Sequence, residues 1–282
     1  MAKPKRVAFQ GERGAFSEEA ARQLLPGSRL DLLPCQRFEE VFQALAKGPA
    51  DYAVVPIENT LAGSVHENYD HLLRFKLPIV AETQVRIVHN LIVRPGVRFS
   101  EVRRVYSHPV ALGQCLRFFA KHPKIRSETY YDTAGSVKML MEQAPEGAAA
   151  IASAAAAEVY GAQILRRSIE DDRRNFTRFF LLQRRAPARP PTASRGGTLK
   201  TSIVFTTRNL PGALFRCLSA FALRDINLHK IESRPLRGKP WEYLFYLDFL
   251  GSPGEDRCRH ALDHLGELTD LLQVLGCYRR GA

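Results

Sequence analysis

The residues best suited to chemistry are concentrated in the segment 171–182, where a polar stretch runs directly into an apolar one. Thr177 and Arg178 stand there between Phe176 and Phe179. A hydroxyl and a guanidinium flanked by large apolar rings indicate a pocket wall that holds an anion in a partly dry place. The same pattern is also compatible with a loop entering a strand, in which threonine is favoured for its β propensity.

A second group of polar residues follows the apolar segment 52–56, which is predicted to be a buried strand. Open α/β sheets place their ligands just beyond such strand ends. The alternative is a turn held by local hydrogen bonds of asparagine and threonine side chains. Because small and polar residues recur here so densely, binding is the favoured interpretation. The candidates are Glu58, Asn59, Thr60 and Gly63.

Two further candidate sites lie where a predicted strand meets a predicted helix. Ser107 is the expected N-cap of a helical run over 110–122, and Asp132 or Thr133 caps a later helix. The free backbone N–H groups at a helix start bind anions. His108, beside the first of these sites, is a candidate acid or base, although a capping or core histidine is the commoner case.

The Gly-rich turn Gly11–Ser17 offers another anion cradle between a strand and a helix. It is not a dinucleotide fingerprint, because the third glycine and a suitably spaced acidic partner are missing.

The elements that position these residues alternate between strand and helix over 1–185, which predicts an α/β catalytic half. A continuous strand is expected over 86–94. The segment 186–198 is rich in proline and glycine and is predicted to be a linker. The remainder, 199–282, has the order βαββαβ of a ferredoxin-like unit. Its small sheet has an exposed edge, which favours pairing with a second copy.

The bulk composition narrows the class of protein. The chain has 282 residues, 45% hydrophobic and 25% charged, as is typical of globular proteins. No apolar run approaches the roughly 20 residues that span a bilayer, and the short apolar run after the basic N-terminus is no signal peptide. We therefore expect a cytoplasmic protein without a membrane partner. The five cysteines lack Cys-x-x-Cys spacing, so neither a metal site, a disulfide framework nor another cofactor is expected.

The net charge of +12 is compatible with nucleic acid or with small anions. Its densest runs are pairs of arginines without the interleaved aromatic residues of a stacking platform. A nucleic-acid partner is therefore disfavoured, and a small anionic substrate is preferred.

Six motifs, in order along both halves, resemble those of prephenate dehydratase. The most specific is Asn175-x-Thr177-Arg178-Phe179. The others are Gly11-x-x-Gly14-Ala15-Phe16-Ser17, Pro56-Ile57-Glu58-Asn59-Thr60-x-x-Gly63-Ser64-Val65, Ser107-His108-Pro109-x-Ala111-Leu112-x-Gln114-Cys115, Asp132-Thr133-Ala134, and the C-terminal pair Pro211-Gly212-Ala213-Leu214 with Ile231-Glu232-Ser233-Arg234-Pro235.

The resemblance implies two α/β lobes of periplasmic-binding-protein type (type II) with a cleft between them, followed by an ACT regulatory domain. It implies loss of CO2 and of the 4-hydroxyl from prephenate to give phenylpyruvate in L-phenylalanine biosynthesis. By resemblance Thr177 is catalytic, and Arg178 would hold a carboxylate. The full set expected around the substrate is Glu58, Asn59, Thr60, Gly63, Ser107, His108, Thr133, Ala134, Asn175, Arg178 and Phe179.

The ACT resemblance also implies feedback by L-phenylalanine and a homodimer or homotetramer formed through this domain. Glu232 is expected near the ammonium group of the effector. The residues expected around the effector are Asn209, Pro211, Gly212, Ala213, Leu214, Glu232, Ser233 and Arg234.

Two departures from the family pattern stand out. Thr60 replaces a common serine, which keeps the hydroxyl, and Val110 replaces a common glutamine, which removes a polar group. Two other functions stay open: arogenate dehydratase, with the same chemistry on an amino substrate, and a non-catalytic amino-acid sensor. The hydroxyl of Thr177 beside Arg178 argues against a pure sensor, which has no leaving group to serve.

Overall fold

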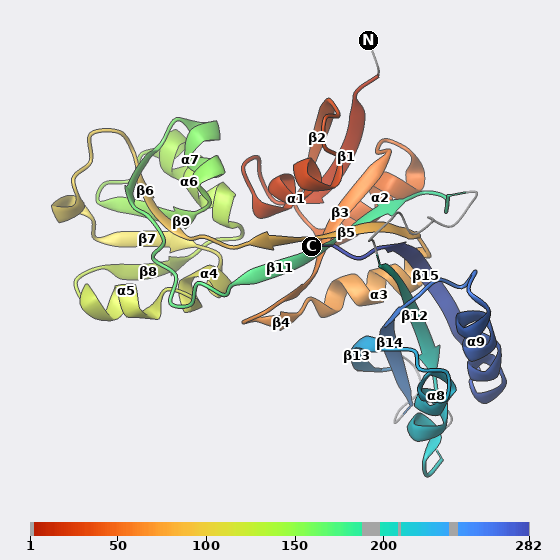
Figure 1. The fold of residues 1–282 in the computed structure, drawn as a ribbon. Coiled ribbons are helices and arrows are strands. Elements are labelled where there is room, and N and C mark those ends of the chain that lie inside the picture. The colour runs from red at the N-terminus through yellow and green to blue at the C-terminus, as the bar shows by residue number, and fades with distance from the viewer. Residues whose placement is uncertain (1–2, 188–197, 208–209, 237–241, 282) are drawn as a thin grey trace. The chain divides into compact units, whose positions relative to one another are not determined.

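The computed structural model describes residues 3–187, 198–207, 210–236 and 242–281 (Figure 1). The chain forms two compact units. The first comprises Met1–Tyr69 and Thr83–Phe180, and the second comprises Asp70–Glu82 and Leu181–Ala282. The linker predicted over 186–198 falls largely outside the described residues.

The first sheet has the strand order β2-β1-β3-β11-β5, with β4 paired to β3. Its central strands are buried on both faces, and the predicted run Val7–Phe9 is fully enclosed. The strands are β1 (Lys5–Gln10), β2 (Leu30–Cys35), β3 (Tyr52–Asn59), β4 (Gly63–Ser64), β5 (Ile79–Arg86) and β11 (Phe176–Gln183), and the helices between them are α1 (Phe16–Leu24), α2 (Phe38–Lys47) and α3 (His66–Phe75).

The second sheet has the order β10-β6-β9-β7-β8, in which β7 is parallel to both β8 and β9. Its core is aliphatic and encloses Val105 and Ile151. The strands are β6 (Asn90–Val93), β7 (Arg104–Ser107), β8 (Arg126–Thr129), β9 (Ala148–Ala152) and β10 (Gln163–Arg166), and the helical segments are η1 (Phe99–Glu101), α4 (Pro109–Gly113), α5 (Leu116–Lys121), α6 (Thr133–Gln143) and α7 (Ala154–Tyr160).

The predicted continuous strand over 86–94 is wrong, because β5 ends at Arg86 and β6 begins at Asn90. The segment 87–89 passes from one sheet to the other. It is tied to the return connection, where the N–H of Ile87 donates to the carbonyl of Asn175 at 2.8 Å. This hydrogen bond joins the two connections, so the two sheets are linked by two crossings that run side by side.

The predicted single helix over 110–122 is also wrong, because α4 ends at Gly113 and α5 begins at Leu116. Asp171 occupies the break. Its backbone N–H donates to the carbonyl of Gln114 at 2.8 Å, and its carboxylate accepts the N–H groups of Leu116 and Arg117 at 2.8 and 3.0 Å. A carboxylate that caps a new helix start in this way stabilises the interruption.

The second unit contains a four-stranded antiparallel sheet of order β13-β14-β12-β15. Phe205, Phe221 and Phe249 pack in its core, between the sheet and its two helices. Its elements are β12 (Leu199–Thr206), α8 (Ala213–Ala222), β13 (Leu228–Pro235), β14 (Tyr243–Leu250), α9 (Asp256–Leu268) and β15 (Leu272–Arg279). The βαββαβ order and the α/β class are therefore confirmed.

This unit also encloses an ion pair. The Nζ of Lys200 lies 2.7 Å from a carboxylate oxygen of Glu82, and both side chains are almost fully buried. The same carboxylate accepts the N–H of Gly281 at 3.0 Å. Such a pair is retained because removing either partner would leave an uncompensated buried charge.

Among the described residues, no helix has the length and apolar character needed to cross a membrane. The described part of the chain likewise holds no cluster of three or more metal-ligating side chains. All five cysteines are free thiols.

Candidate active site

A cavity of about 420 Å³ lies within the first unit. It is lined by the end of β3, the turn after it, the crossing 87–89, the starts of α1, α4 and α6, and one face of β11. Six residues expected from the sequence line it: Asn59, Gly63, His108, Thr133, Thr177 and Phe179. Five further lining residues are Phe16, His89, Val110, Gln114 and Tyr131.

The alternation of β11 determines which of its side chains reach the cavity. Thr177 and Phe179 both line it. Arg178 and Phe180 occupy the intervening positions, and successive side chains of a strand point to opposite faces. Arg178 is 6% exposed, and its guanidinium carbon lies 4.7 Å from the ring centre of Phe180. Arg178 is not among the residues that line the cavity, so its expected role as the partner of a substrate carboxylate stays a prediction.

The hydroxyl of Thr177 has a defined hydrogen-bonding role. The side-chain nitrogen of Asn59 lies 2.9 Å from its Oγ1. An amide nitrogen is a donor only, so Oγ1 is the acceptor and the hydroxyl hydrogen remains available to donate. Accepting a hydrogen bond polarises a hydroxyl and makes it a better donor in turn.

The amide of Asn59 is oriented by the backbone. Its Oδ1 accepts the N–H groups of Leu61 and Ala62 at 3.0 and 2.8 Å. These two donors require the oxygen on their side, so the nitrogen must face Thr177. The same nitrogen lies 3.1 Å from the carbonyl of Phe176, so its two hydrogens are shared among this carbonyl, Thr177 and the side chain of Asn175. Asn59 therefore holds the strand β11 and its threonine together.

Two more amides extend this arrangement away from Thr177. The Oδ1 of Asn175 accepts from Asn59 at 2.7 Å, and its Nδ2 donates to the Oε1 of Gln114 at 2.8 Å. The nitrogen of Gln114 donates to the Oδ1 of Asn59 at 3.3 Å. Three carboxamides thus form a closed set of donors and acceptors behind the hydroxyl of Thr177. We call these three residues the amide cluster.

His108 lies at the cavity as the N-cap of α4, so the capping alternative describes its position. Its Nδ1 accepts the backbone N–H of Val110 at 3.2 Å. The neutral ring therefore carries its hydrogen on Nε2. Burial lowers the pKa of His108, although the nearby carboxylate of Asp132 opposes this effect. A neutral N–H donor at a helix start suits an anionic ligand.

In two other predicted residues, the side-chain hydroxyl forms hydrogen bonds with backbone groups. Ser107 is fully buried and donates to the carbonyl of Ile151 at 2.6 Å, so the predicted N-cap role is wrong. Thr60 donates to the carbonyl of Arg174 at 2.7 Å and accepts the N–H of Phe176 at 3.0 Å. Its hydroxyl therefore fixes the crossing that precedes Thr177, and a serine hydroxyl would serve the same purpose.

The remaining predicted residues lie behind the lining of the cavity. Glu58 is half-buried on β3 opposite Ser64 of β4. Ala134 is fully buried in the first turn of α6, directly after the lining residue Thr133. Neither lines the cavity, and Asn175 contributes through the amide cluster.

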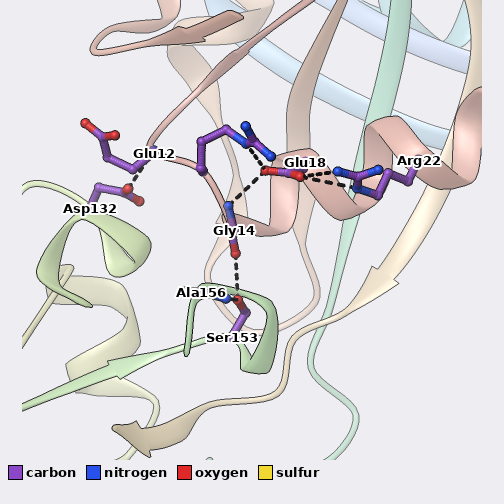
Figure 2. A network of polar contacts seen from close by, with 8 residues as sticks. Glu12, Gly14, Glu18, Arg22, Asp132, Ser153 and Ala156 are labelled. Carbon is purple, nitrogen blue, oxygen red and sulfur yellow. Dashed lines mark hydrogen bonds and ion pairs between the residues drawn. The ribbon is translucent and has the colours of Figure 1, made fainter. Parts of the chain in front are cut away.

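The Gly-rich turn does not present a vacant anion cradle, because the protein's own carboxylates occupy it (Figure 2). The N–H of Gly14 donates to Glu18, and the N–H of Glu12 donates to Asp132, both at 2.9 Å. Burial raises the pKa of Asp132, while the hydrogen bonds that it accepts from backbone N–H groups act in the opposite direction. Ser153, on the far side of Gly14, donates to its carbonyl at 2.6 Å. The turn therefore ties the first sheet to the helices of the second.

Replacing Gly14 with alanine is expected to destabilise the first unit strongly. Gly14 has φ of +80°, and an added Cβ would lie 2.5 Å from the Cα of Ala156. Gly96 is a matched control, because it has φ of +87° with nothing within 4 Å of an added Cβ. The free energy of unfolding should fall by about 1–3 kcal/mol more in Gly14→Ala than in Gly96→Ala. Equal losses measured by chemical denaturation would contradict the close approach.

The effector residues expected from the sequence lie in two places in the second unit. Gly212 is the N-cap of α8 with φ of +74°, a conformation that favours glycine. It is flanked by the exposed Pro211, while Ala213 and Leu214 are half-buried at the start of the helix. Asn209 lies outside the described residues.

The second group follows the alternation of β13. Ser233 is exposed. Glu232 and Arg234 occupy the other face, where their charged groups lie 3.5 Å from Lys230 and 3.4 Å from Asp70, respectively. The carboxylate expected near an effector ammonium therefore already has a cationic neighbour within its own strand.

Comparison with known proteins places this geometry in a family. The family model for prephenate dehydratase matches residues 7–187. Arogenate dehydratase/prephenate dehydratase 2 of Arabidopsis thaliana is 45% identical over 97% of this chain and 72% of its own length.

Two solved structures agree over almost the whole chain. One is a prephenate dehydratase from Arthrobacter aurescens in complex with L-Phe, at 33% identity and a TM-score of 0.88, covering 98% of this chain and 90% of that one. The other is GqqA, described as a novel type of quorum quenching acylase, at 36% identity and a TM-score of 0.88, covering 98% of both chains. Because the family model covers more than half of the chain and the Arabidopsis thaliana relative is 45% identical over nearly all of it, this chain belongs to the prephenate dehydratase family and is a hydro-lyase.

Proposed function

We propose that this protein converts prephenate to phenylpyruvate. The observation that carries the proposal is the hydroxyl of Thr177, whose oxygen accepts the amide of Asn59 and whose hydrogen is left to donate at the cavity. The reaction breaks the bond between the ring and its carboxylate and the bond between the ring and its 4-hydroxyl. CO2 leaves without the electron pair of its bond, which enters the ring, and the 4-hydroxyl leaves with its own pair and takes up one proton from solvent to become water.

The protein has little bond-making to do, because the product ring is aromatic and its formation drives the reaction. The remaining demand is on the leaving hydroxyl, which departs more easily when it is protonated or strongly hydrogen-bonded. Such assistance contributes about 10²–10⁴-fold in rate. A threonine hydroxyl is a weak acid, so Thr177 acts by donating a hydrogen bond that the amide of Asn59 strengthens.

The substrate anion is received by neutral donors. His108 supplies the Nε2–H described above, and the helix start at Thr133 lines the same cavity. Phe16 and Phe179 contribute apolar surface. A low dielectric favours decarboxylation, because the charge spread over the departing carboxylate and ring needs less solvation than a compact carboxylate.

Arogenate is the alternative substrate for the same chemistry. It differs from prephenate by an amino group in place of the side-chain keto oxygen. The Arabidopsis thaliana relative carries both activities in its name. The first experiment is therefore a rate assay with each substrate in parallel, with phenylpyruvate followed by absorbance and phenylalanine by chromatography. Turnover of arogenate alone would show that arogenate, and not prephenate, is the substrate. Turnover of neither compound would contradict the proposal.

Regulation by L-phenylalanine through an ACT domain is part of this proposal. Its support is the βαββαβ unit, the turn at Gly212, the exposed Ser233, and a similar solved structure in complex with L-Phe. Addition of L-phenylalanine is expected to lower the rate of prephenate turnover, and D-phenylalanine at equal concentration is the control for chirality. An unchanged rate together with no binding heat in calorimetry would remove the effector from the proposal.

Acylase activity is the second candidate, because the similar structure GqqA is described as a quorum quenching acylase. A threonine nucleophile requires an adjacent general base. Within the described residues, the hydrogen bonds assigned to Thr177 connect it to a carboxamide, which is no base. We therefore rank this activity below dehydration. Acyl release by the wild-type protein but not by Thr177→Val would reverse this order.

A further inference from the structure

His89 is a buried side chain at the cavity that takes no part in the steps proposed above. His89 lies on the crossing 87–89, is 2% exposed and lines the cavity. Its Nε2 lies 2.9 Å from the Oε1 of Gln114. Its Nδ1 is buried and has no hydrogen-bond partner among the described residues. The bond to Gln114 is therefore the one side-chain hydrogen bond of this ring among the described residues.

The contacts of Gln114 fix the tautomer of this histidine. Its Oε1 also accepts from Asn175, and its nitrogen donates to Asn59, so the atom facing His89 is the carbonyl oxygen. The Nε2 of His89 must therefore carry a hydrogen and donate it. Burial lowers the pKa of His89, although the bond to Gln114 and the charge of Glu170 act in the opposite direction. The ring is neutral, with a bare Nδ1.

We infer that His89 is a positioning residue that anchors the amide cluster and, through Gln114 and Asn59, strengthens hydrogen-bond donation by the hydroxyl of Thr177. This inference rests on the proposed dehydration, because it concerns the rate of that step. Among the described residues no hydrogen bond joins His89 to Thr177, so by this inference His89 acts through the cluster and not on the substrate.

The direction of the hydrogen bonds supports the inference. His89 donates to the carbonyl of Gln114, whose amide donates to the carbonyl of Asn59, whose amide donates to Thr177. Every donor in this series points the same way, toward the leaving hydroxyl. Each accepted hydrogen bond makes the next group a better donor, so the effects reinforce one another. A bond reversed anywhere in the series would work against the next.

The series is also anchored at both ends. The backbone N–H groups of Leu61 and Ala62 hold Asn59 at one end, and His89 holds Gln114 at the other. Loss of His89 leaves the oxygen of Gln114 with one donor instead of two. The backbone of Gln114 is held as the C-cap of α4 and by the N–H of Asp171, and the hydrogen bonds of its side chain then fix where its carboxamide lies.

The test compares two replacements of the same residue. In glutamine the side-chain nitrogen is three bonds from Cβ, as Nε2 is in histidine, so His89→Gln keeps the donor. His89→Leu removes it at similar volume. His89→Leu is expected to lower kcat about tenfold with KM changed less than threefold, as for loss of one buried hydrogen bond. His89→Gln should remain within about threefold of wild type.

A double variant shows whether the effect passes through Gln114. In a Gln114→Leu background, His89→Leu is expected to cause no further loss of kcat, because the hydrogen bonds that join His89 to Asn59 through Gln114 are already absent. An equal loss in both backgrounds would overturn the inference, as would normal kcat in His89→Leu or equal kcat values in the leucine and glutamine variants. A drop in melting temperature with unchanged kcat would assign His89 to folding alone.

The wild-type protein provides a test that does not depend on variants that fold. In nitrogen-15 spectra of the histidine side chains at neutral pH, His89 is expected to show a protonated Nε2 and a bare Nδ1. The opposite tautomer would overturn the inference. Wild type without turnover of prephenate or arogenate would instead refute the proposed function, and this result is distinguishable because the tautomer is measured independently of activity.

Discussion

Replacement of Thr177 by valine is expected to lower kcat by about 100-fold or more, the loss seen when one essential hydrogen-bond donor to a developing charge is removed. Valine has nearly the same shape as threonine and also favours strands, so β11 should be preserved. The substrate is bound by other groups, so KM should change little. The measurement is steady-state kinetics with prephenate, and the melting temperature serves as the check on folding.

Thr177→Ser is the matched control for this prediction. It keeps the hydroxyl in reach of Asn59 and loses only a methyl group, so kcat should stay within about tenfold of wild type. If the Thr177→Val variant turned over prephenate at the wild-type rate, Thr177 would have no part in the mechanism. If kcat were as low in Thr177→Ser as in Thr177→Val, the methyl group of Thr177 and not its hydroxyl would be required for the rate.

Replacement of Asn59 by aspartate is expected to have an effect of similar size, about 100-fold on kcat. The new carboxylate still accepts the N–H groups of Leu61 and Ala62. Its other oxygen, however, would face Thr177 as an acceptor. The hydroxyl would then donate to the carboxylate and no longer to the leaving group. The change alters a single nitrogen to oxygen and almost no volume.

Asn90→Asp is the control, because Asn90 is a buried asparagine of the first unit that donates to the carbonyl of Ala152 at 3.2 Å, whereas Asn59 is half-buried. It shares no hydrogen bond with Thr177. Both aspartate variants should lose stability, but only Asn59→Asp should lose kcat in the protein that remains folded. Equal kcat losses in the two variants would indicate general disruption, and the directional role of Asn59 would be wrong.

The sequence was informative about the order of elements and about which strand ends carry the site. The buried strands near Val7 and Val54, the helices that follow them and the βαββαβ unit all have local signals, namely apolar period and turn residues. The same signals do not reveal how a run is interrupted. The break at Gln114 depends on Asp171, which is distant in the chain and caps α5. No local sequence pattern predicts where this helix begins.

The amide cluster could not be predicted from the sequence for a related reason. Asn59 and Thr177 are 118 residues apart, and His89 meets Gln114 across 25 residues. Their partnership arises only when two crossings run side by side. Arg178 is different, because the alternation of a strand already implies that it and Thr177 face opposite ways. The period of two alone therefore separates the face of Thr177 from that of Arg178.

The alternation along β11 has a consequence for how substrate preference can change. Thr177 and Phe179 have odd numbers and face the cavity, while Arg178 and Phe180 have even numbers and are buried on the other side. Substitutions at odd positions can reshape the pocket without disturbing the packing behind it. Substitutions at even positions alter folding and leave the pocket lining unchanged. A shift of the β11 register by one residue would exchange the two sets, so substrate preference can change by point substitution on the cavity face only while this register is kept.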